Sequence, residues 1–475
     1  MRRSILLLAV IMQIFASCNK KQGNDNSTGI KPKKRQPNVI VILTDDQGYK
    51  DVGFNGSPDI KTPNIDRIAE NGVVFTNGYV SYAVCGPSRA GLITGRYQDR
   101  FGFSRNPLFA PKDALQGVPK SEEMLSEALK KAGYKNMAIG KWHLGAHASL
   151  RPLERGFDEF FGFLTGGHKY FPEQWTRKNL SEITSQFDAY NTKLLRNNKR
   201  IEETEYLTDA LSREAVNFVE RNKNNPFFLY LAYNAPHTPL QATQKYLERY
   251  AHVKDKKRQI YAAMVSAVDD GVGNLLNKLE ELKINENSIV FFLSDNGGPE
   301  NHSANNAELR EGKGSMYEGG IRVPFAVQWP GTIPKGKQYH NPVISLDIFA
   351  TAVVQANVTP KHKLDGVNLI PYLTGENSKI PHDALYWRQY DYNGLAVRKG
   401  DFKLVKDKKG NTELYNLLED ISEEKLLKDS EKFSELKQMH DQWNTKNPEP
   451  AFLGLRQNKA YNKIHPDRFT NGEEY

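Results

Sequence analysis

Short apolar runs recur along most of the chain, and polar segments separate them. Val39–Leu43 is continuously apolar with polar flanks, which is typical of a strand buried on both faces of a sheet. Further strands are predicted over Asn136–Ile139, Phe227–Ala232, Ser288–Leu293 and Val323–Gln328. Helices are predicted over Pro63–Asn71, Glu122–Ala132, Tyr206–Arg221 and Gln259–Leu282. Strands that alternate with helices indicate an α/β fold, with a large, mainly parallel mixed sheet sandwiched by helices.

The pattern changes after about residue 382. Short β-like runs separated by turn residues occupy Leu395–Arg398, Phe402–Val405 and Glu413–Tyr415. A helix is predicted near Ser422–Lys437. We therefore expect a main domain over residues 38–381 and a small C-terminal subdomain over residues 382–475, built from an antiparallel sheet and a helix.

The N-terminus has the pattern of an export signal. Two arginines precede the apolar stretch Ile5–Phe15, and small residues follow it. This stretch is shorter than the ~20 residues that span a bilayer. The residues before Cys18 resemble a bacterial lipobox, which implies cleavage of residues 1–17 as a lipoprotein signal peptide and acylation of the Cys18 thiol. The alternative is simple secretion, with Cys18 incidental.

Residues 18–37 are almost entirely polar, a composition typical of a tether. Together with the predicted signal, this segment indicates an exported protein of the periplasm or cell envelope. We expect the membrane to be a partner only through the lipid at Cys18.

Composition narrows the possible functions. The 475 residues contain 65 Lys and Arg against 56 Asp and Glu, so the formal charge is +9. A basic surface can favour a sulfated or phosphorylated substrate, although scattered solvated lysines account for most such charge. No repeated basic and aromatic stripe is present, so nucleic acid is not expected as a partner. Two cysteines exclude a disulfide scaffold and a zinc site built from cysteines.

Acidic residues follow two of the predicted strands. Asp45 and Asp46 come after the first strand, and Asp295 and Asn296 come after the strand at Ser288–Leu293. Ligands of open α/β sheets sit beyond the carboxyl ends of the strands. Three carboxylates and an amide could converge there on one hard cation such as Ca²⁺. Acidic residues also commonly begin turns after strands, so both interpretations stay open on these residues alone.

Cys85 is predicted to lie at the N-terminus of a helix. Pro87 suits a first helical turn, and Gly95 suits a helix end. Unsatisfied N–H groups and the helix dipole would favour an anion there and give an acidified, reactive thiol. An inert buried cysteine is the alternative.

Four segments resemble one family. Cys85–Arg96 contains Cys-x-Pro-Ser-Arg followed by Leu-Ile-Thr-Gly-Arg, and it resembles the signature of the type I sulfatases, the formylglycine-dependent members of the alkaline phosphatase superfamily. Gly133–Leu144 resembles the second family signature, although Asn136 stands where Ser or Thr is usual. Ala235–Pro239 and Gly312–Pro324 also match, in the family's order. Bacterial arylsulfatases and N-acetylgalactosamine sulfatases are the members it most resembles.

The resemblance implies an alkaline-phosphatase-like catalytic domain over residues 38–381 that hydrolyses sulfate esters. It implies that a formylglycine-generating or anaerobic sulfatase-maturating enzyme oxidises Cys85 to formylglycine (3-oxoalanine). One hydroxyl of the hydrated aldehyde would attack sulfur and expel the alcohol, and collapse to the aldehyde would then release sulfate.

The resemblance also implies the roles of the surrounding residues. The ligands of one Ca²⁺ would be Asp45, Asp46, Cys85, Asp295 and Asn296. Three cations would hold the diol and neutralise the sulfate oxygens: Arg89, Lys141 and Lys313. His237 would be the general acid for the leaving alkoxide and His143 the base that starts sulfate elimination, although these two roles could be exchanged.

Two other functions were weighed against this one. Phosphate mono- or diester hydrolases of the superfamily use a Ser or Thr nucleophile and two metals with histidine ligands, whereas this chain has Cys85 and Asn296 in the corresponding places. A non-catalytic glycan-binding lipoprotein would be expected to have lost a catalytic residue, and all of them are intact.

The substrate is expected to be a sulfated saccharide, either glycosaminoglycan, mucin or an algal glycan, attacked at a chain end. Candidate sugar contacts are His168, Lys169, Trp175, Arg177, Trp387 and Arg388. The first four could instead belong to a variable surface insertion.

Overall fold

The computed structural model describes residues 35–469 of the chain. The described residues from Gln36 onward form one compact unit. The predicted signal peptide (1–17), Cys18 and most of the predicted tether (18–37) lie outside the described residues. Within residues 35–469, every helix is too short or too polar to cross a membrane.

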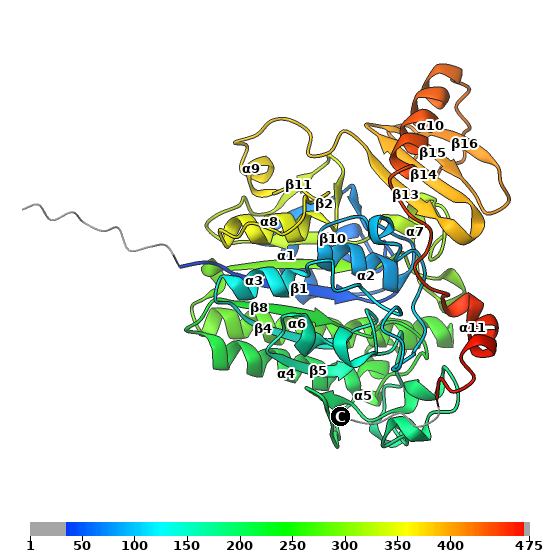
Figure 1. The fold of residues 1–475 in the computed structure, drawn as a ribbon. Helices are drawn as coiled ribbons and strands as arrows, with labels where there is room; N and C mark the ends of the chain where they lie inside the picture. Colours follow the sequence, from blue (N-terminus) through cyan, green and yellow to red (C-terminus); the bar gives the residue numbers. More distant parts are fainter. Residues whose placement is uncertain (1–34, 470–475) are drawn as a thin grey trace, which may run out of the picture. The chain divides into compact units, whose positions relative to one another are not determined.

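A ten-stranded sheet forms the centre of the main domain, in the order β11-β2-β10-β9-β1-β8-β4-β5-β6-β7 (Figure 1). β1 (Asn38–Thr44) runs parallel to its neighbours β8 (Phe227–Ala232) and β9 (Ser288–Ser294). β4 (Lys135–Lys141) is parallel to β8, and β10 (Phe325–Gln328) is antiparallel to β9. The outer strands are β2 (Gly72–Phe75), β5 (Glu159–Phe163), β6 (Leu195–Arg196), β7 (Lys199–Arg200) and β11 (Lys337–Tyr339). The prediction of a large, mainly parallel mixed sheet is confirmed.

β1 shows how the sheet is covered on both faces. Val39, Val41 and Leu43 face one core, and Ile40 and Ile42 face the other. The first core includes side chains of α2 (Cys85–Thr94), α3 (Leu125–Lys131) and α8 (Asp347–Gln355). The second includes those of α1 (Pro63–Glu70), α4 (Leu207–Asn222) and α6 (Lys256–Glu281). In Figure 1, α8 and α4 accordingly lie on opposite sides of the sheet.

The predicted helices lie close to observed ones, with shifted ends. α3 begins at Leu125 rather than Glu122, because the Glu127 side chain accepts a hydrogen bond from the Met124 N–H at 2.7 Å and caps the helix there. Elements not predicted from the sequence include β3 (Gly78–Tyr79), β12 (Val343–Ile344), α5 (Gln244–Leu247), α7 (Glu318–Ile321), α9 (Ile370–Leu373) and α11 (Asn458–Ile464).

The C-terminal antiparallel sheet is present, with α10 packed on it (Figure 1). Its strands are β13 (Leu385–Gln389), β14 (Gly394–Lys399), β15 (Phe402–Lys406) and β16 (Thr412–Asn416). α10 spans Ser430–Asn444, so the prediction of a helix from Ser422 is wrong at its start. The Asp420 carboxylate accepts the Lys425 N–H at 2.7 Å and forms a turn, and Asp429 caps α10 by accepting the Lys432 N–H at 2.9 Å.

β13 was not predicted, and its side chains attach the C-terminal sheet to the main domain. Trp387 is fully buried, and its Nε1–H donates to the Val80 carbonyl at 2.7 Å. Arg388 is 7% exposed, and its guanidinium donates to Asp99 at 3.1 Å and to the Pro448 carbonyl at 2.7 Å. The prediction that these two residues contact sugar is therefore wrong, because both are occupied inside the protein.

Replacing Trp387 should destabilise the fold. Trp387→Ala removes a fully buried ring and leaves the Val80 carbonyl unpaired, so we expect the free energy of unfolding to fall by about 3–5 kcal/mol. Thermal unfolding followed by circular dichroism measures the effect. Leu418→Ala is the control, because Leu418 is 76% exposed and its truncation should change stability by less than about 0.5 kcal/mol. A Trp387→Ala midpoint equal to that of Leu418→Ala would contradict the role of this side chain in the core.

Candidate active site

Four neighbouring parallel strands bring polar residues to one edge of the sheet. β9, β1, β8 and β4 are adjacent, and their ends are aligned because Thr44 pairs with Ser294 and Leu43 pairs with Ala232. The residues that these strand ends deliver are Asp45, Asp46, Lys141, His143, His237, Asp295 and Asn296. Cys85 and Arg89 are added by α2, and Lys313 comes from the loop before α7.

The acidic residues form one buried cluster. Ligand atoms of Asp45, Asp46, Cys85 and Asp295 all lie within 4.8 Å of one another. Asn296 donates from Nδ2 to Asp46 at 2.8 Å, while its Oδ1 is buried without a hydrogen-bond partner among the described residues. Three carboxylates and an unpaired amide oxygen are the donor set that a hard cation such as Ca²⁺ prefers. The residues present therefore fit the metal site predicted from the sequence.

Each carboxylate of the cluster has its own cationic partner. Arg89 donates from Nε to Asp295 at 2.7 Å, and Lys141 donates to Asp45 at 2.5 Å. Lys313 donates to Asp46 at 2.8 Å. Arg89 and Lys141 are completely buried, as are Asp45 and Asp295. Because an uncompensated buried charge is strongly destabilising, this pairing is what allows so many charges to share one site.

The pKa values of the carboxylates reflect this crowding. Burial and the neighbouring Asp45 carboxylate raise the pKa of Asp295 to about 6. Burial alone would also raise the pKa of Asp46, but the Lys313 ammonium and His237 outweigh it and hold that pKa well below its usual range. A bound divalent cation would favour the ionised form of all three carboxylates.

Cys85 is the first residue of α2 and lies inside the cluster. Its Sγ is 3.4 Å from Asp45 Oδ1 and 3.3 Å from the Nζ of Lys313. Burial and the Asp45 carboxylate raise the pKa of the thiol to about 12, against the opposing charges of Lys141 and Lys313. The prediction of an acidified thiol is wrong, because removal from water outweighs the helix N-terminus.

The two histidines differ in their surroundings. His237 is half-buried, its Nδ1 is 2.6 Å from the Thr238 carbonyl and its Nε2 is 3.7 Å from Asp46 Oδ2. His143 is buried, and its Nδ1 has no hydrogen-bond partner within residues 35–469. Burial lowers the pKa of His237 to about 3 and that of His143 well below its usual value, so both rings are neutral in the described site.

Two site residues have strained backbones. Asp46 and His143 have φ angles of 64° and 57°, in the left-handed region that non-glycine residues rarely adopt. Such conformations cost about 1–3 kcal/mol each and persist where the surrounding structure fixes them. Here the strain turns a carboxylate and an imidazole toward the cluster directly after β1 and β4.

The segment Thr165–Lys169 reaches the site through its glycines. A Cβ on Gly166 would lie 2.7 Å from the His143 ring, and one on Gly167 would lie 3.2 Å from the His237 ring. His168 is instead fully buried, with both ring nitrogens 2.8 Å from backbone carbonyls. Trp175 is 4% exposed and packs against His168. His168 and Trp175 were predicted to contact sugar, and this is wrong because both lie in the core.

Lys169 and Arg177 are half-buried, so their predicted contact with sugar stays a prediction. Tyr190 was missed by the sequence analysis. It is half-buried and stands 2.8 Å from the position of a Cβ on Gly167, beside the His237 ring. Its segment carries no motif that could have identified it.

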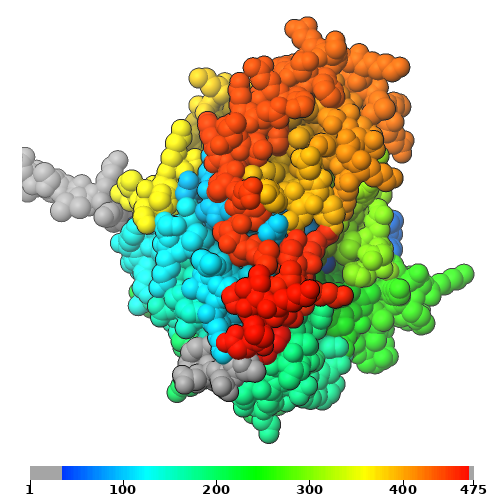
Figure 2. All heavy atoms as spheres, turned by 45° about the vertical axis from the view of Figure 1, so that its right-hand side comes forward, coloured from blue at the N-terminus to red at the C-terminus, as the bar shows by residue number. Residues whose placement is uncertain are grey.

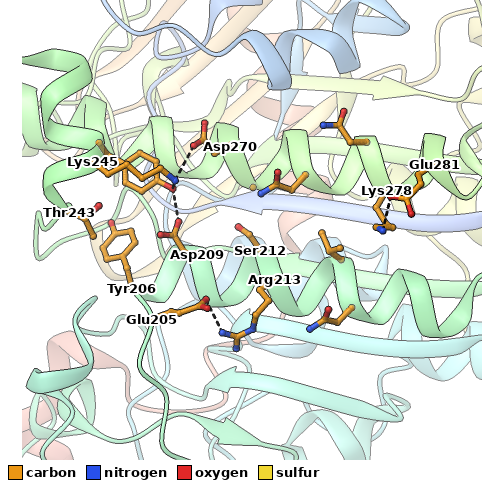
Figure 3. A pocket seen from close by; sticks show the side chains of 16 residues that line it. Glu205, Tyr206, Asp209, Ser212, Arg213, Thr243, Lys245, Asp270, Lys278 and Glu281 are labelled. Atoms are coloured by element: carbon orange, nitrogen blue, oxygen red, sulfur yellow. Dashed lines mark hydrogen bonds and ion pairs between the residues drawn. The ribbon is translucent and has the colours of Figure 1, made fainter.

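A cleft of about 360 Å³ opens beside Lys313, and it includes Tyr392, Lys408 and Arg456. These three residues were also missed, because they come from separate loops that only the fold brings together. A larger cavity, of about 710 Å³, lies between α4 and α6 (Figure 3). Its charged residues pair with one another, as Lys245 does with Asp270 and Lys278 with Glu281, and none of the sulfate-site residues lines it.

Comparisons with known proteins agree with this geometry. The sulfatase family profile matches residues 37–358, and the C-terminal profile of N-sulphoglucosamine sulphohydrolase matches residues 312–448. The chain is 35% identical to human N-acetylgalactosamine-6-sulfatase over 73% of this chain and 67% of that protein. It is 35% identical to the arylsulfatase of Hemicentrotus pulcherrimus over 78% of this chain and 67% of that protein.

A solved structure is similar over almost the whole chain. Ps i-CgsB in complex with k-i-k-neocarrahexaose is 39% identical, covers 92% of this chain and 100% of its own, and has a TM-score of 0.84. The family profile and these relatives extend over the sheet, over α2 and over the loops that build the charged cluster. The chain therefore belongs to the sulfatase family: it is a type I sulfatase of the alkaline phosphatase superfamily and a sulfuric ester hydrolase.

Proposed function

We propose that this enzyme hydrolyses sulfate esters on a sulfated polysaccharide, using formylglycine made from Cys85 and one Ca²⁺. The observation that carries the proposal is the buried cluster in which Cys85 lies within 4.8 Å of three carboxylates. Of the three glycan classes considered from the sequence, an algal galactan is favoured. The relative bound to k-i-k-neocarrahexaose is 39% identical across 92% of this chain, whereas the human N-acetylgalactosamine-6-sulfatase match covers 73%.

The proposed setting follows from the N-terminus. The signal pattern and Cys18 support export to the cell envelope with a lipid anchor, as expected from the sequence. The raised pKa of Cys85 supports the need for a maturation enzyme, because a thiol that stays protonated at neutral pH is a poor nucleophile.

Asp45, Asp46, Asp295 and Asn296 would hold Ca²⁺ together with the modified side chain of residue 85. When bound, Ca²⁺ would polarise the sulfate group and lower the pKa of the attacking hydroxyl. Lys313 and Lys141 each contact a carboxylate of the cluster, and Lys313 also contacts the sulfur atom of residue 85. Their ammonium groups would hold the nucleophile in place and neutralise the negative charge that develops on the sulfate oxygens.

Arg89 fixes the floor of the site. Its Nη1 donates to the Lys141 carbonyl at 3.1 Å while its Nε donates to Asp295. The Nη2 is buried without a hydrogen-bond partner among the described residues and lies 3.7 Å from Asp45 Oδ2. This unused donor is available to an anionic oxygen of the nucleophile or the sulfate group.

The half-buried position of His237 supports its role as the general acid, because the leaving sugar must occupy the open side of the site. The contact of Nδ1 with the Thr238 carbonyl leaves Nε2 to deliver the proton. His143 is deeper, and its partnerless Nδ1 supports its role as the base that starts sulfate elimination. A bound sulfate group places negative charge beside both rings, which raises their pKa values toward the working range.

Cys85→Ala should reduce sulfate release to background, because the nucleophile is removed. The measurement is sulfate released from defined sulfated galactan and glycosaminoglycan oligosaccharides by protein co-expressed with a maturation enzyme. Peptide mass spectrometry of residue 85 confirms maturation of the wild type, and thermal unfolding shows that the variant is folded. Release that survives in Cys85→Ala would overturn the mechanism, and release only from glycosaminoglycans would overturn the galactan assignment.

Chelation should lower both the activity and the melting temperature, and added Ca²⁺ should restore them. An ion that binds only the folded state stabilises it by about 2.7 kcal/mol at a hundredfold excess over its Kd. The matched variant is Asn296→Ala, which removes the unpaired amide oxygen and should show a smaller response to chelator. A melting temperature that does not change on chelation would contradict the metal site.

The two histidine roles predict different dependence on the leaving group. His237→Ala should slow turnover of a sulfated sugar by about 10²–10⁴-fold, and that of 4-nitrophenyl sulfate much less, because nitrophenolate leaves without a proton. His143→Ala should slow both substrates to a similar extent. Steady-state kcat values on the two substrates provide the test. The opposite pattern would show that the roles are exchanged.

A further inference from the structure

A cationic cleft lies beside the catalytic site. Lys313, which contacts Cys85, lines one wall of it together with Gly314. The other walls come from residues near Arg105, from the loop around His302, from Tyr392 and from residues 455–457. In Figure 2, the red C-terminal segment borders the orange C-terminal sheet in this region. The cleft of about 360 Å³ therefore shares a catalytic residue with the sulfate site.

Positive charge exceeds negative charge in this cleft. Its charged lining residues are Arg105, Lys313, Asp391, Lys408 and Arg456. Asp391, the one carboxylate, accepts hydrogen bonds from the Arg105 guanidinium at 2.6 Å and from Gln457 at 3.1 Å. Lys313 is paired with Asp46. Lys408 and Arg456 are left without an ion pair to any described residue, so their charges are not neutralised by the protein there.

The same aromatic ring contacts both of these cations. The Arg456 guanidinium lies 4.2 Å from the centroid of the Tyr392 ring, and the Lys408 ammonium lies 5.6 Å from it. The ammonium is also 3.6 Å from the position of a Cβ on Gly314, which places it over the backbone next to Lys313. Cation–π contact orients a cation without cancelling its charge, and both side chains are exposed.

We propose that Lys408, Arg456 and Tyr392 form a second anion subsite, which binds a sulfate group on a sugar neighbouring the one that is hydrolysed. The proposal rests on the proposed function. The guanidinium supplies a planar fork that matches the oxygens of a sulfate group, and the lysine adds a point charge. The subsite selects a glycan with sulfate groups on successive sugars over a sugar with a single sulfate group.

The test compares one oligosaccharide sulfated on several sugars with a sugar that carries only the scissile sulfate group. In Lys408→Ala/Arg456→Ala, kcat/KM for the first should fall about tenfold more than for the second, mainly through KM. The control is Lys409→Ala/Lys459→Ala, which removes the same charge from exposed residues outside the cleft and should leave both values unchanged. Equal losses on both substrates, or no loss on either, would overturn the subsite.

Binding separates this inference from the proposed catalytic function. Calorimetric titration of the same multiply sulfated oligosaccharide into Cys85→Ala protein needs no turnover, so it reports on the subsite even if the enzyme hydrolyses a different glycan. Adding Lys408→Ala/Arg456→Ala should weaken its Kd about tenfold at low salt, and less at high salt because exposed charges are screened. An unchanged Kd would overturn the proposal.

Discussion

The concentration of charge at the ends of β1 and β9 is the constraint on which the rest of the site depends. Parallel pairing of these strands places Asp45, Asp46 and Asp295 together, out of contact with water. Such a cluster is tolerated only if cations reach it. Arg89 comes from α2, Lys141 from the end of β4 and Lys313 from the loop before α7. Compensation of charge and assembly of the catalytic groups are therefore achieved by the same contacts.

The C-terminal sheet is tied to this arrangement by a second set of buried charges. Lys403 on β15 is completely buried and lies 2.8 Å from both Glu318 and Glu423. Glu318 begins α7, five residues after Lys313. The Glu423 carboxylate also accepts the Glu318 N–H at 2.6 Å. The loop that carries Lys313 is thus held from both sides, which explains how a small sheet far along the chain contributes to the geometry of the sulfate site.

The sequence allowed prediction of those features that depend on local pattern and on strand ends. Apolar runs located the central strands, and acidic residues after two of them located the cluster, because parallel strands end at one edge. The sugar contacts could not be predicted in this way. His168 and Trp387 have side chains suited to sugar, but whether such a side chain faces solvent or the core depends on packing between distant segments. Tyr392, Lys408 and Arg456 meet only through loop contacts.

The error about Cys85 is informative because both opposing effects are real. Its position at the start of α2 favours an anion, but complete burial and the carboxylate of Asp45 disfavour one more strongly. A site that excludes water in order to strengthen its interactions with sulfate thereby prevents an ordinary thiol from ionising. A nucleophile that works here must draw its reactivity from covalent modification and from a bound cation rather than from the helix. The same low-dielectric environment that makes Arg89, Lys141 and Lys313 effective toward sulfate also makes unmodified cysteine ineffective.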